Sequence, residues 1–550
     1  MKDEMMNMPE KIYADTAFIN AKVITVSEND EIAEAVCTVG NKILAVGANE
    51  LIKEYTGPET KVIDAAGRTV MPGFIDSHIH FVMYGLLDHG VVNVDYKHVS
   101  SIKDILKLIE KEASVKKKGE WIVLSGYDHN KLEEKRHPLK EEFDSVAPDN
   151  PVQCIRCCAH MGVYNSYALN LCNVTSAEQF APGEVVTDDD GNLTGLLKET
   201  AHMSLSKKVI LSENELLNGI KNANKIMLEN GITSVHDAGS YGKTTMRLLQ
   251  KSCADRTVKV RVRPMIFDMY GKESGKEYIE DFLNTGIYTN LGDEHFKLGP
   301  VKIMTDGSTS GPSCATIEPY SHDKNLKGIQ VWQQDEADEM IDKVHKSEFQ
   351  MTAHAVGDKA VTVMLNGYEK ALKDMPRENH RHRIEHCALT NEDIIKRVRD
   401  LSIIPVSNPA FISINACDYN RFYGERVKYM FPLKSYIENN VITAIGSDAP
   451  VTEANPMFSL YGAVNRCDIK TEESCGDNQK VGIKDIVRMF TYNGAYAAFE
   501  EGIKGSLEPG KLADIVMLSE NILDYPEKKL MDVKTVMTMI DGEVVYERKE

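Results

Sequence analysis

Two histidines separated by one residue, His78 and His80, end the apolar run FIDSHIH at residues 74–80. Side chains two positions apart lie on the same face of a β-strand, so both imidazoles would point to one place. Two nitrogens held by a rigid strand are part of what a metal ion needs. The alternative is a chance pair with one packed and one exposed histidine, because the H-x-H pattern is short.

Three further segments end on a residue that can bind a metal. His354 ends MTAH (351–354), His386 ends HRIEH (382–386), and Asp448 ends ITAIGSD (442–448). Each alone could be a packed core histidine or an aspartate that caps a helix. Together with the histidine pair, they place four histidines and one aspartate at the carboxyl ends of four strands. This arrangement predicts a shared metal site.

Lys302 lies within the apolar run PVKIMT at residues 300–305. A buried ammonium group is costly unless it is paired, and burial lowers its pKa. A neutral amine can capture carbon dioxide as a carbamate, whose two oxygens can bridge two cations. The alternative is an ion pair with an acid such as Asp306, and the pattern alone does not decide between them.

The elements that would carry these residues alternate between helical and extended patterns through the middle of the chain. Helical periodicity covers residues 101–118, 213–230, 336–349 and 393–400. Eight strand candidates are at 74–80, 121–126, 232–237, 300–305, 351–354, 382–386, 403–407 and 442–448. Eight such units predict an α/β fold of the (β/α)8 TIM-barrel type, with its chemistry at the carboxyl ends of the strands.

The connection between the second and third of these strands is too long for an ordinary loop. We therefore expect an insertion after barrel strand 2, at about residues 127–210, that walls or roofs the mouth of the site. Both ends of the chain read instead as short β segments. Residues 1–72 and 499–550 are thus predicted to form one composite sheet domain, and residues 73–498 the barrel.

Composition excludes several classes of protein. The 550 residues are 42% hydrophobic, so the chain can bury a large core, and a net charge of −19 disfavours nucleic acid and anionic membrane surfaces as partners. The start of the chain carries acids without an apolar signal segment, and no run approaches the roughly 18 apolar residues of a membrane span. A cytoplasmic location is expected. Eleven cysteines, an odd number, suit free thiols, including Cys154, Cys157 and Cys158.

From about Ala14 to the C-terminus, the sequence resembles the amidohydrolase superfamily, in the branch typified by YtcJ-like proteins and N-substituted formamide deformylase. The motifs that carry the resemblance, in order, are MPGFIDSHIH (71–80), GLLKE (195–199), VKIMTDGS (301–308), AHAVGDKA (353–360), RIEHC (383–387), GSDAPV (446–451), TYNGAYAA (491–498) and KGSLEPGKLADIVML (504–518).

The resemblance implies two divalent metal ions, with zinc the expected element. His78 and His80 would bind one ion and His354 and His386 the other, and Lys302 would bridge them as its carbamate. It also implies that Asp448 binds a metal beside the attacking water, and that the terminal β segments form a small composite β-sandwich.

One segment departs from the family pattern. Where the family reads close to D-G-H, this chain has Cys158-Ala159-His160, so the pocket wall and the substrate are expected to differ from those of better-known relatives. His160 is a candidate substrate contact. Arg383 and Asp306 are candidates for substrate contacts or for orienting partners of the ligands. His236 and Asp237 also end a strand and are expected behind the ligands.

These residues predict an enzyme that hydrolyses a carbon–nitrogen bond other than a peptide bond, in a linear or cyclic N-substituted or N-acyl amide. Metal-activated hydroxide would attack the carbonyl carbon, and Asp448 would move the proton, with His386 and Lys302 completing the catalytic set. The first alternative is a mononuclear deaminase of a small heterocycle, with Asp358 as proton donor. The second is a noncatalytic metal- or ligand-binding protein. A small-molecule substrate and a homodimer are the expected partners.

Overall fold

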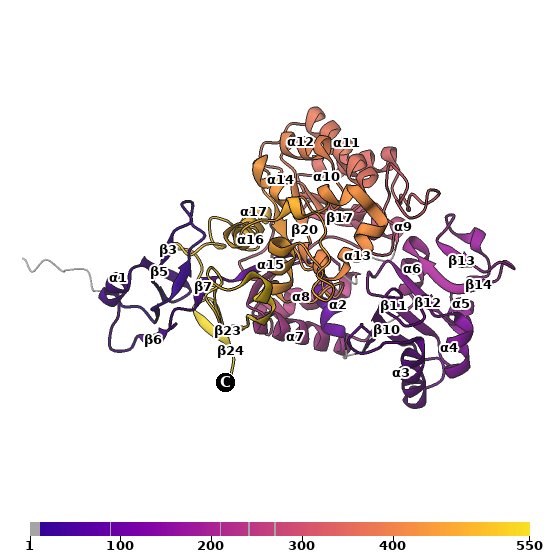
Figure 1. The fold of residues 1–550 in the computed structure, drawn as a ribbon, viewed down its shortest axis with the longest axis horizontal. Coiled ribbons are helices and arrows are strands. Elements are labelled where there is room, and N and C mark those ends of the chain that lie inside the picture. Colours follow the sequence, from indigo (N-terminus) through magenta and orange to yellow (C-terminus); the bar gives the residue numbers. More distant parts are fainter. Residues whose placement is uncertain (1–11, 88–89, 210, 240–241, 269–270, 550) are drawn as a thin grey trace, which may run out of the picture.

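The computed structural model describes residues 12–87, 90–209, 211–239, 242–268 and 271–549. Parallel strands occupy its centre (Figure 1). They form two sheets with the orders β16-β15-β8 and β17-β18-β19-β20-β21. Their bounds are β8 Phe74–Ile79, β15 Ile232–Asp237, β16 Arg261–Pro264, β17 Val301–Met304, β18 Met351–Ala355, β19 Arg383–His386, β20 Ile404–Ser407 and β21 Ala444–Ile445.

The two parallel sheets are joined at both edges. Beyond β16, Ile266 forms a parallel bridge with Val301 of β17. Beyond β21, the N–H of Asp448 donates to the carbonyl of His78 in β8 at 2.7 Å. The carboxyl ends of all these strands therefore face the same side, where the four candidate histidine ligands and Asp448 lie, while Lys302 is the second residue of β17.

Helices alternate with the parallel strands and pack around them, as the apolar periodicity predicts. In α7 (Glu213–Glu229), Ser212 caps the first turn, and Leu216, Ile220 and Met227 are buried. The other helices of this layer are α8 Gly242–Ala254, α9 Lys272–Leu283, α10 Gln334–Lys346, α11 Asp358–Asp374, α12 Glu392–Asp400 and α14 Leu433–Glu438. The helices predicted at 213–230, 336–349 and 393–400 are confirmed within two or three residues.

The prediction for residues 121–126 is wrong in one respect. The segment is a strand, β10 (Ile122–Tyr127), but it pairs with β9 and β11 rather than with β8 or β15. It belongs to a separate sheet with the order β13-β14-β12-β11-β10-β9. The position beside β15 is taken by β16, whose buried arginines hid it from an apolar-run search. The insertion therefore begins directly after β8 and α2 (Phe81–Leu86), not after a second core strand.

The insertion sheet lies at one end of the molecule (Figure 1). The remaining strands of this sheet are β9 Val92–Asn93, β11 Val152–Arg156, β12 Met161–Tyr164, β13 Val185–Thr187 and β14 Leu193–Lys198. Its helices are α3 Ile102–Val115, α4 Lys140–Val146, α5 Ser166–Leu171 and α6 Glu199–Ser206. Ile105 and Ile109 of α3 pack onto Leu124 of β10, so the helix predicted at 101–118 supports this sheet and not the central strands.

The two ends of the chain meet in one sheet at the opposite end of the molecule (Figure 1). Its order is β24-β23-β22-β7-β2-β3, and the antiparallel pairing of β22 with β7 joins the C-terminal to the N-terminal strands. A second sheet, β5-β4-β1-β6, is built from N-terminal strands alone. The bounds are β1 Thr16–Ile19, β2 Lys22–Ile24, β3 Ile32–Ala33, β4 Ala35–Val39, β5 Lys42–Gly47, β6 Lys61–Asp64, β7 Thr69–Pro72, β22 Ile515–Leu518, β23 Thr535–Ile540 and β24 Glu543–Glu547. The first eleven residues of the predicted composite domain lie outside the described residues.

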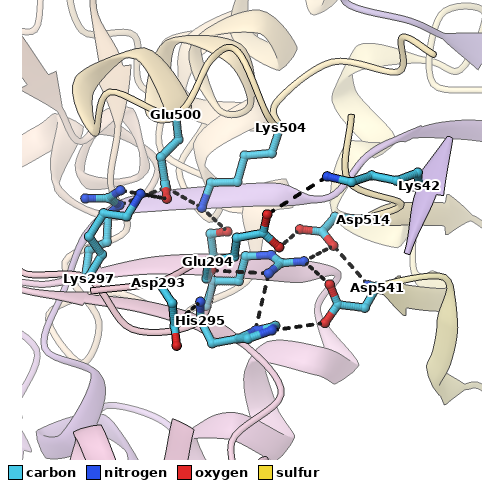
Figure 2. Close-up of polar contacts among 12 residues, drawn as sticks. Lys42, Asp293, Glu294, His295, Lys297, Glu500, Lys504, Asp514 and Asp541 are labelled. Atoms are coloured by element: carbon cyan, nitrogen blue, oxygen red, sulfur yellow. Dashed lines mark hydrogen bonds and ion pairs between the residues drawn. The ribbon is translucent and has the colours of Figure 1, made fainter. Parts of the chain in front are cut away.

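A network of ion pairs connects the parallel strands to the C-terminal segment (Figure 2). Arg261 of β16 binds Asp514 at 2.7 Å and Asp541 at 2.6 Å. Arg263, two residues further along the strand, binds Glu500 at 2.6 Å. Because these arginines and Glu500 are buried, the network fixes the terminal strands against the base of the central sheets.

The other helices are α1 Asn49–Glu54, α13 Ile412–Tyr423, α15 Pro456–Asn465, α16 Ile483–Met489 and α17 Tyr492–Ala497. Within the described ranges, none of the helices has the length and apolarity to cross a bilayer. Each of the eleven cysteines is a free thiol, which confirms the interpretation of Cys154, Cys157 and Cys158.

Candidate metal centre

The histidine pair and the aspartate meet at the carboxyl ends of β8 and β21. The Nε2 atoms of His78 and His80 each lie 3.3 Å from Oδ1 of Asp448. His78, His386 and Asp448 each offer a ligand atom within 4.8 Å of the others, and all three are buried. Strands far apart in the sequence thus bring these groups to one point.

Two of these atoms, Nε2 of His78 and Oδ1 of Asp448, are buried and have no hydrogen-bond partner among the described residues. Buried polar atoms are rarely left without a hydrogen bond. Two such atoms close together, both able to bind a metal, are expected where a cation binds. Imidazole nitrogens and a carboxylate oxygen are suitable ligands for zinc and related divalent ions. The residues therefore fit a metal ion.

Three of the four candidate ligand histidines, His78, His386 and His354, are held in place through one ring nitrogen. Nδ1 of His78 lies 2.5 Å from Oε2 of Glu385, and Nδ1 of His386 lies 2.8 Å from Oδ1 of Asn408. Nε2 of His354 lies 3.0 Å from the carbonyl oxygen of Gly307. These contacts leave His78 and His386 with Nε2, and His354 with Nδ1, as the nitrogens available to an ion.

The protonation of the cluster follows from burial and from these contacts. Burial lowers the pKa of His80 to about 4 and that of His386 to about 3, so both imidazoles are neutral near pH 7. Burial alone would raise the pKa of Asp448, but the imidazoles of His78 and His80 hold it well below its ordinary value. The neutral imidazoles of His80 and His386 and the ionised Asp448 are the forms that bind a metal ion. Burial opposes protonation of His78, but Asp448 and Glu385 raise its pKa above the ordinary value, so an ion bound there would replace its proton.

Arg383 lies behind the cluster and contacts groups of neighbouring strands. Its guanidinium donates to Glu385 at 2.8 Å, to the carbonyl of Ser77 at 2.7 Å, and contacts Nδ1 of His236 at 3.0 Å. Thr352 donates a further hydrogen bond to Glu385 at 2.6 Å. Arg383 therefore orients Glu385, which in turn orients His78.

Lys302 is buried and faces the cluster region from β17. Its Nζ donates to the carbonyl of Ala238 at 2.9 Å and lies 5.0 Å from the centre of the Phe267 ring. Burial lowers its pKa to about 8, against the attraction of Glu385 and Asp448. A substantial share of this amine is therefore unprotonated in mildly alkaline solution.

Asp306 and Asp358 both bind backbone amides. Asp306 accepts hydrogen bonds from the N–H groups of Ala315, Val356 and Gly357 at 2.8–3.0 Å. Asp358 accepts one from the N–H of Ile317 at 2.9 Å. Asp306 therefore organises the loops around His354, which favours the orienting alternative over a substrate contact. Asp237 likewise accepts from the N–H of Phe81.

His160 reaches the cluster from the insertion, in the turn between β11 and β12. Its ring centre lies 4.6 Å from that of His354, and its Nδ1 lies 2.8 Å from Oε2 of Glu199. Burial would lower the pKa of His160, but the Glu199 carboxylate raises it to about 9. The altered Cys-Ala-His segment thus forms one wall of the site.

A cavity of about 430 Å³ lies between the insertion and the loops that follow the parallel strands. A much smaller hollow, lined by His160, His354, His386 and Asp448, opens beside it at the ligands. The two share the lining residues Ser310, Asn415 and Val451. The cavity is large enough for a small-molecule substrate next to the candidate metal ligands.

Sequence reasoning missed the acceptors that orient the ligands. Glu385 precedes His386 within the quoted RIEHC motif, and Glu199 ends the quoted GLLKE motif. Asn408 directly follows the strand at 403–407. A search for carboxylates and amides beside each ligand strand would have found them, since ligand imidazoles need such partners.

Comparison with known proteins gives a family for this arrangement. The family model described as "Amidohydrolase family" matches residues 61–546. Curated relatives include Protein LONG AFTER FAR-RED 3 of Arabidopsis thaliana (29% identity, 98% of this chain and 92% of the relative). Putative amidohydrolase YtcJ of Bacillus subtilis shares 27% identity, covering 96% of this chain and 98% of its own. N-substituted formamide deformylase of Arthrobacter pascens shares 26%, covering 97% and 98%.

Solved structures agree with the family match. A metal-dependent hydrolase from Pyrococcus horikoshii superposes with a TM-score of 0.73 at 25% identity, over 93% of this chain and 99% of its own. An adenosine deaminase from Xanthomonas campestris with bound zinc shares the fold, with a TM-score of 0.55 at 11% identity over 97% and 93% of the two chains. The resemblance found in the motifs is therefore confirmed, and the chain belongs to the amidohydrolase family as a metal-dependent hydrolase.

Proposed function

We propose that this hydrolase cleaves a carbon–nitrogen bond other than a peptide bond, in a linear or cyclic N-substituted or N-acyl amide. The observation that carries the proposal is the convergence of unpartnered, buried ligand atoms from His78 and Asp448 beside a substrate-sized cavity. The 26% identity to an N-substituted formamide deformylase, over nearly the whole of both chains, supports the choice of substrate class.

The proposed metal ligands are four histidines, Asp448 and Lys302. His78 and His80 would hold one ion, His354 and His386 a second, and Asp448 would bind beside the attacking water. A bound divalent ion lowers the pKa of water and polarises a carbonyl. Asp448, whose pKa is held well below its ordinary value, would accept a proton from the attacking water and return it to the leaving nitrogen.

Lys302 is proposed to bridge the two ions as a carbamate. Its unprotonated amine forms a bond to the carbon of carbon dioxide and releases one proton, which leaves a carboxylate with two oxygens. The buried position, the single hydrogen bond to Ala238 and the lowered pKa support this step. Carbamate formation needs a neutral amine, and burial supplies it.

We propose that the two parallel sheets close into a (β/α)8 barrel through the contacts at Ile266 and Asp448. Residues 73–498 would form the barrel with its insertion, while residues 1–72 and 499–550 would form the composite β-sandwich. The pairing of β22 with β7 supports this division.

Elemental mass spectrometry tests the metal assignment. Protein purified without chelator should carry two equivalents of zinc or a related metal per chain, and Lys302→Ala should carry one or none. The two proteins are then assayed with N-benzylformamide and N-acyl amides, and hydrolysis by the wild type alone is expected. One equivalent that survives the substitution, with release of ammonia from heterocyclic amines, would instead favour the mononuclear deaminase.

A further inference from the structure

A hydrogen bond between His160 and Glu199 lies beside the candidate ligands, and the proposed mechanism does not use it. Glu199 is buried, with 1% of the residue exposed, and it begins α6 directly after β14. Oε2 of Glu199 lies 2.8 Å from Nδ1 of His160, and Oε1 accepts a hydrogen bond from Ser313 at 3.0 Å. The N–H of Glu199 also donates to the carbonyl of His160 at 2.7 Å.

This carboxylate therefore joins two parts of the fold. His160 belongs to the insertion, whereas Ser313 belongs to the loop that follows β17. That loop also supplies the Gly307 carbonyl that orients His354. A Cβ atom at Gly307 would lie 2.6 Å from Oε1 of Glu199, so the glycine allows the close approach.

The backbone around the pair adopts conformations that side chains disfavour. Glu199 has a φ of +45° and Ala159, next to His160, has a φ of +59°. His386 and Asp448 share this feature, with φ values of +70° and +58°. Left-handed backbone at residues other than glycine persists where the surroundings enforce it, and it clusters at functional sites. Glu199 thus shares this backbone conformation with His386 and Asp448.

The free end of the imidazole faces the hollow at the ligands. Nδ1 of His160 is taken by Glu199, and the ring lines the hollow together with His354, His386 and Asp448. Nε2 is therefore the nitrogen that can meet a bound molecule.

We infer that Glu199 is a positioning residue, which fixes His160 so that its Nε2 hydrogen-bonds to the amide group of the substrate beside the ligands. The inference rests on the proposed amide hydrolysis for its substrate, but the geometry of the pair is independent of it. A hydrogen bond from His160 to the substrate would also explain why the turn between β11 and β12 of the insertion lies against the candidate ligands.

A double-mutant cycle with N-benzylformamide tests the inference. Glu199→Gln and His160→Asn should each raise KM about tenfold or more, as expected for losing a strong hydrogen bond. The double variant should be no worse than His160→Asn, because both changes remove one contact. Additive losses would overturn the positioning role.

A matched control separates positioning from simple stability. Glu184 is also buried in the insertion and hydrogen-bonds to Thr200 at the start of α6. Glu184→Gln should lower thermal stability without changing KM more than twofold. If it raises KM as much as Glu199→Gln does, the effect belongs to the packing of α6 and the inference fails.

A crystal structure of Glu199→Gln gives a readout that needs no activity. The ring of His160 should rotate or adopt two positions, while His354 and Asp448 stay in place. An unmoved ring would overturn the inference even if amide hydrolysis is confirmed, and a moved ring would support it even if the substrate is of another class. Should Glu199→Gln fail to fold, Glu199→Asp, which is one methylene shorter, must show the same rise in KM.

Discussion

At the scale of single residues, Glu385 is the carboxylate that contacts the candidate ligand His78 from behind. It is fully buried and holds His78 through the 2.5 Å contact to Nδ1. We predict that Glu385→Gln weakens metal binding about 10- to 100-fold, because the amide is a poorer acceptor than the carboxylate. Competition with a chromogenic chelator measures the change.

The control for this prediction is Glu369→Gln, which removes an exposed carboxylate paired with Arg397 at 3.0 Å. It should leave metal affinity within twofold of the wild type. An unchanged affinity in Glu385→Gln, at an unchanged circular dichroism spectrum, would contradict the role of Glu385 as the group that orients His78.

At the scale of elements, the carboxyl end of β21 must approach β8 closely enough to place Asp448 against the histidines. Gly446 makes this approach possible, since a Cβ atom there would lie 2.5 Å from Cβ of His78. We predict that Gly446→Ala costs about 1–3 kcal/mol of stability and lowers metal affinity, because one strand must shift. Thermal unfolding with and without added zinc measures both effects.

Gly502→Ala is the matched control, because no atom lies within 4 Å of a Cβ placed at Gly502. It should change neither stability nor metal affinity appreciably. Equal behaviour of the two variants would mean that β21 and β8 have room to separate, and that the position of Asp448 is not set by their contact.

The elements also show what the sequence could reveal and what it could not. Apolar runs that end on His80, His354, His386 and Asp448 identified their strands, because a buried strand is continuous in hydrophobic residues. The sequence pattern does not predict β16, because Arg261 and Arg263 interrupt its apolar run. The acidic residues that pair with these arginines lie far along the chain. The apolar run at 121–126 predicts a buried strand, but an apolar run does not indicate which sheet the strand joins. For this reason the pattern alone could not separate β10 from the central strands.

The same limit applied to the site. Ligand types and their order were visible as motifs, whereas the orienting contacts from Glu385, Asn408 and Glu199 depend on pairings between distant segments. The sequence predicts that Lys302 is buried and leaves open an ion pair with Asp306. The structure shows instead that Asp306 accepts hydrogen bonds from three backbone amides.

At the scale of the whole molecule, Glu500 ties the C-terminal segment to the base of the parallel sheets (Figure 2). Its carboxylate binds Arg263 at 2.6 Å, Lys504 at 2.7 Å and Lys297 at 3.3 Å. Lys504 in turn donates to Ser234 of β15 at 2.8 Å. Three cations surround the Glu500 carboxylate. Removing its charge should therefore destabilise the contact between the C-terminal segment and the parallel sheets more than the loss of any surface ion pair would.

We predict that Glu500→Gln lowers the free energy of unfolding by about 3–5 kcal/mol at pH 7, since it leaves buried cations without their counter-charge.

Burial opposes ionisation of Glu500, but Arg263 and Lys504 hold its pKa well below the ordinary 4.5. Its contribution is therefore complete above about pH 4.5 and is lost as the pH falls towards the folded-state pKa. Urea denaturation from pH 7 down to pH 3 should accordingly show a smaller loss of stability below about pH 4.5 in Glu500→Gln than in the wild type. Asp281→Asn, which removes an exposed acid 3.5 Å from Lys243, is the control and should follow the wild-type curve. Equal stability of Glu500→Gln and wild type at pH 7 would show that the ion network does not hold the terminal strands to the core.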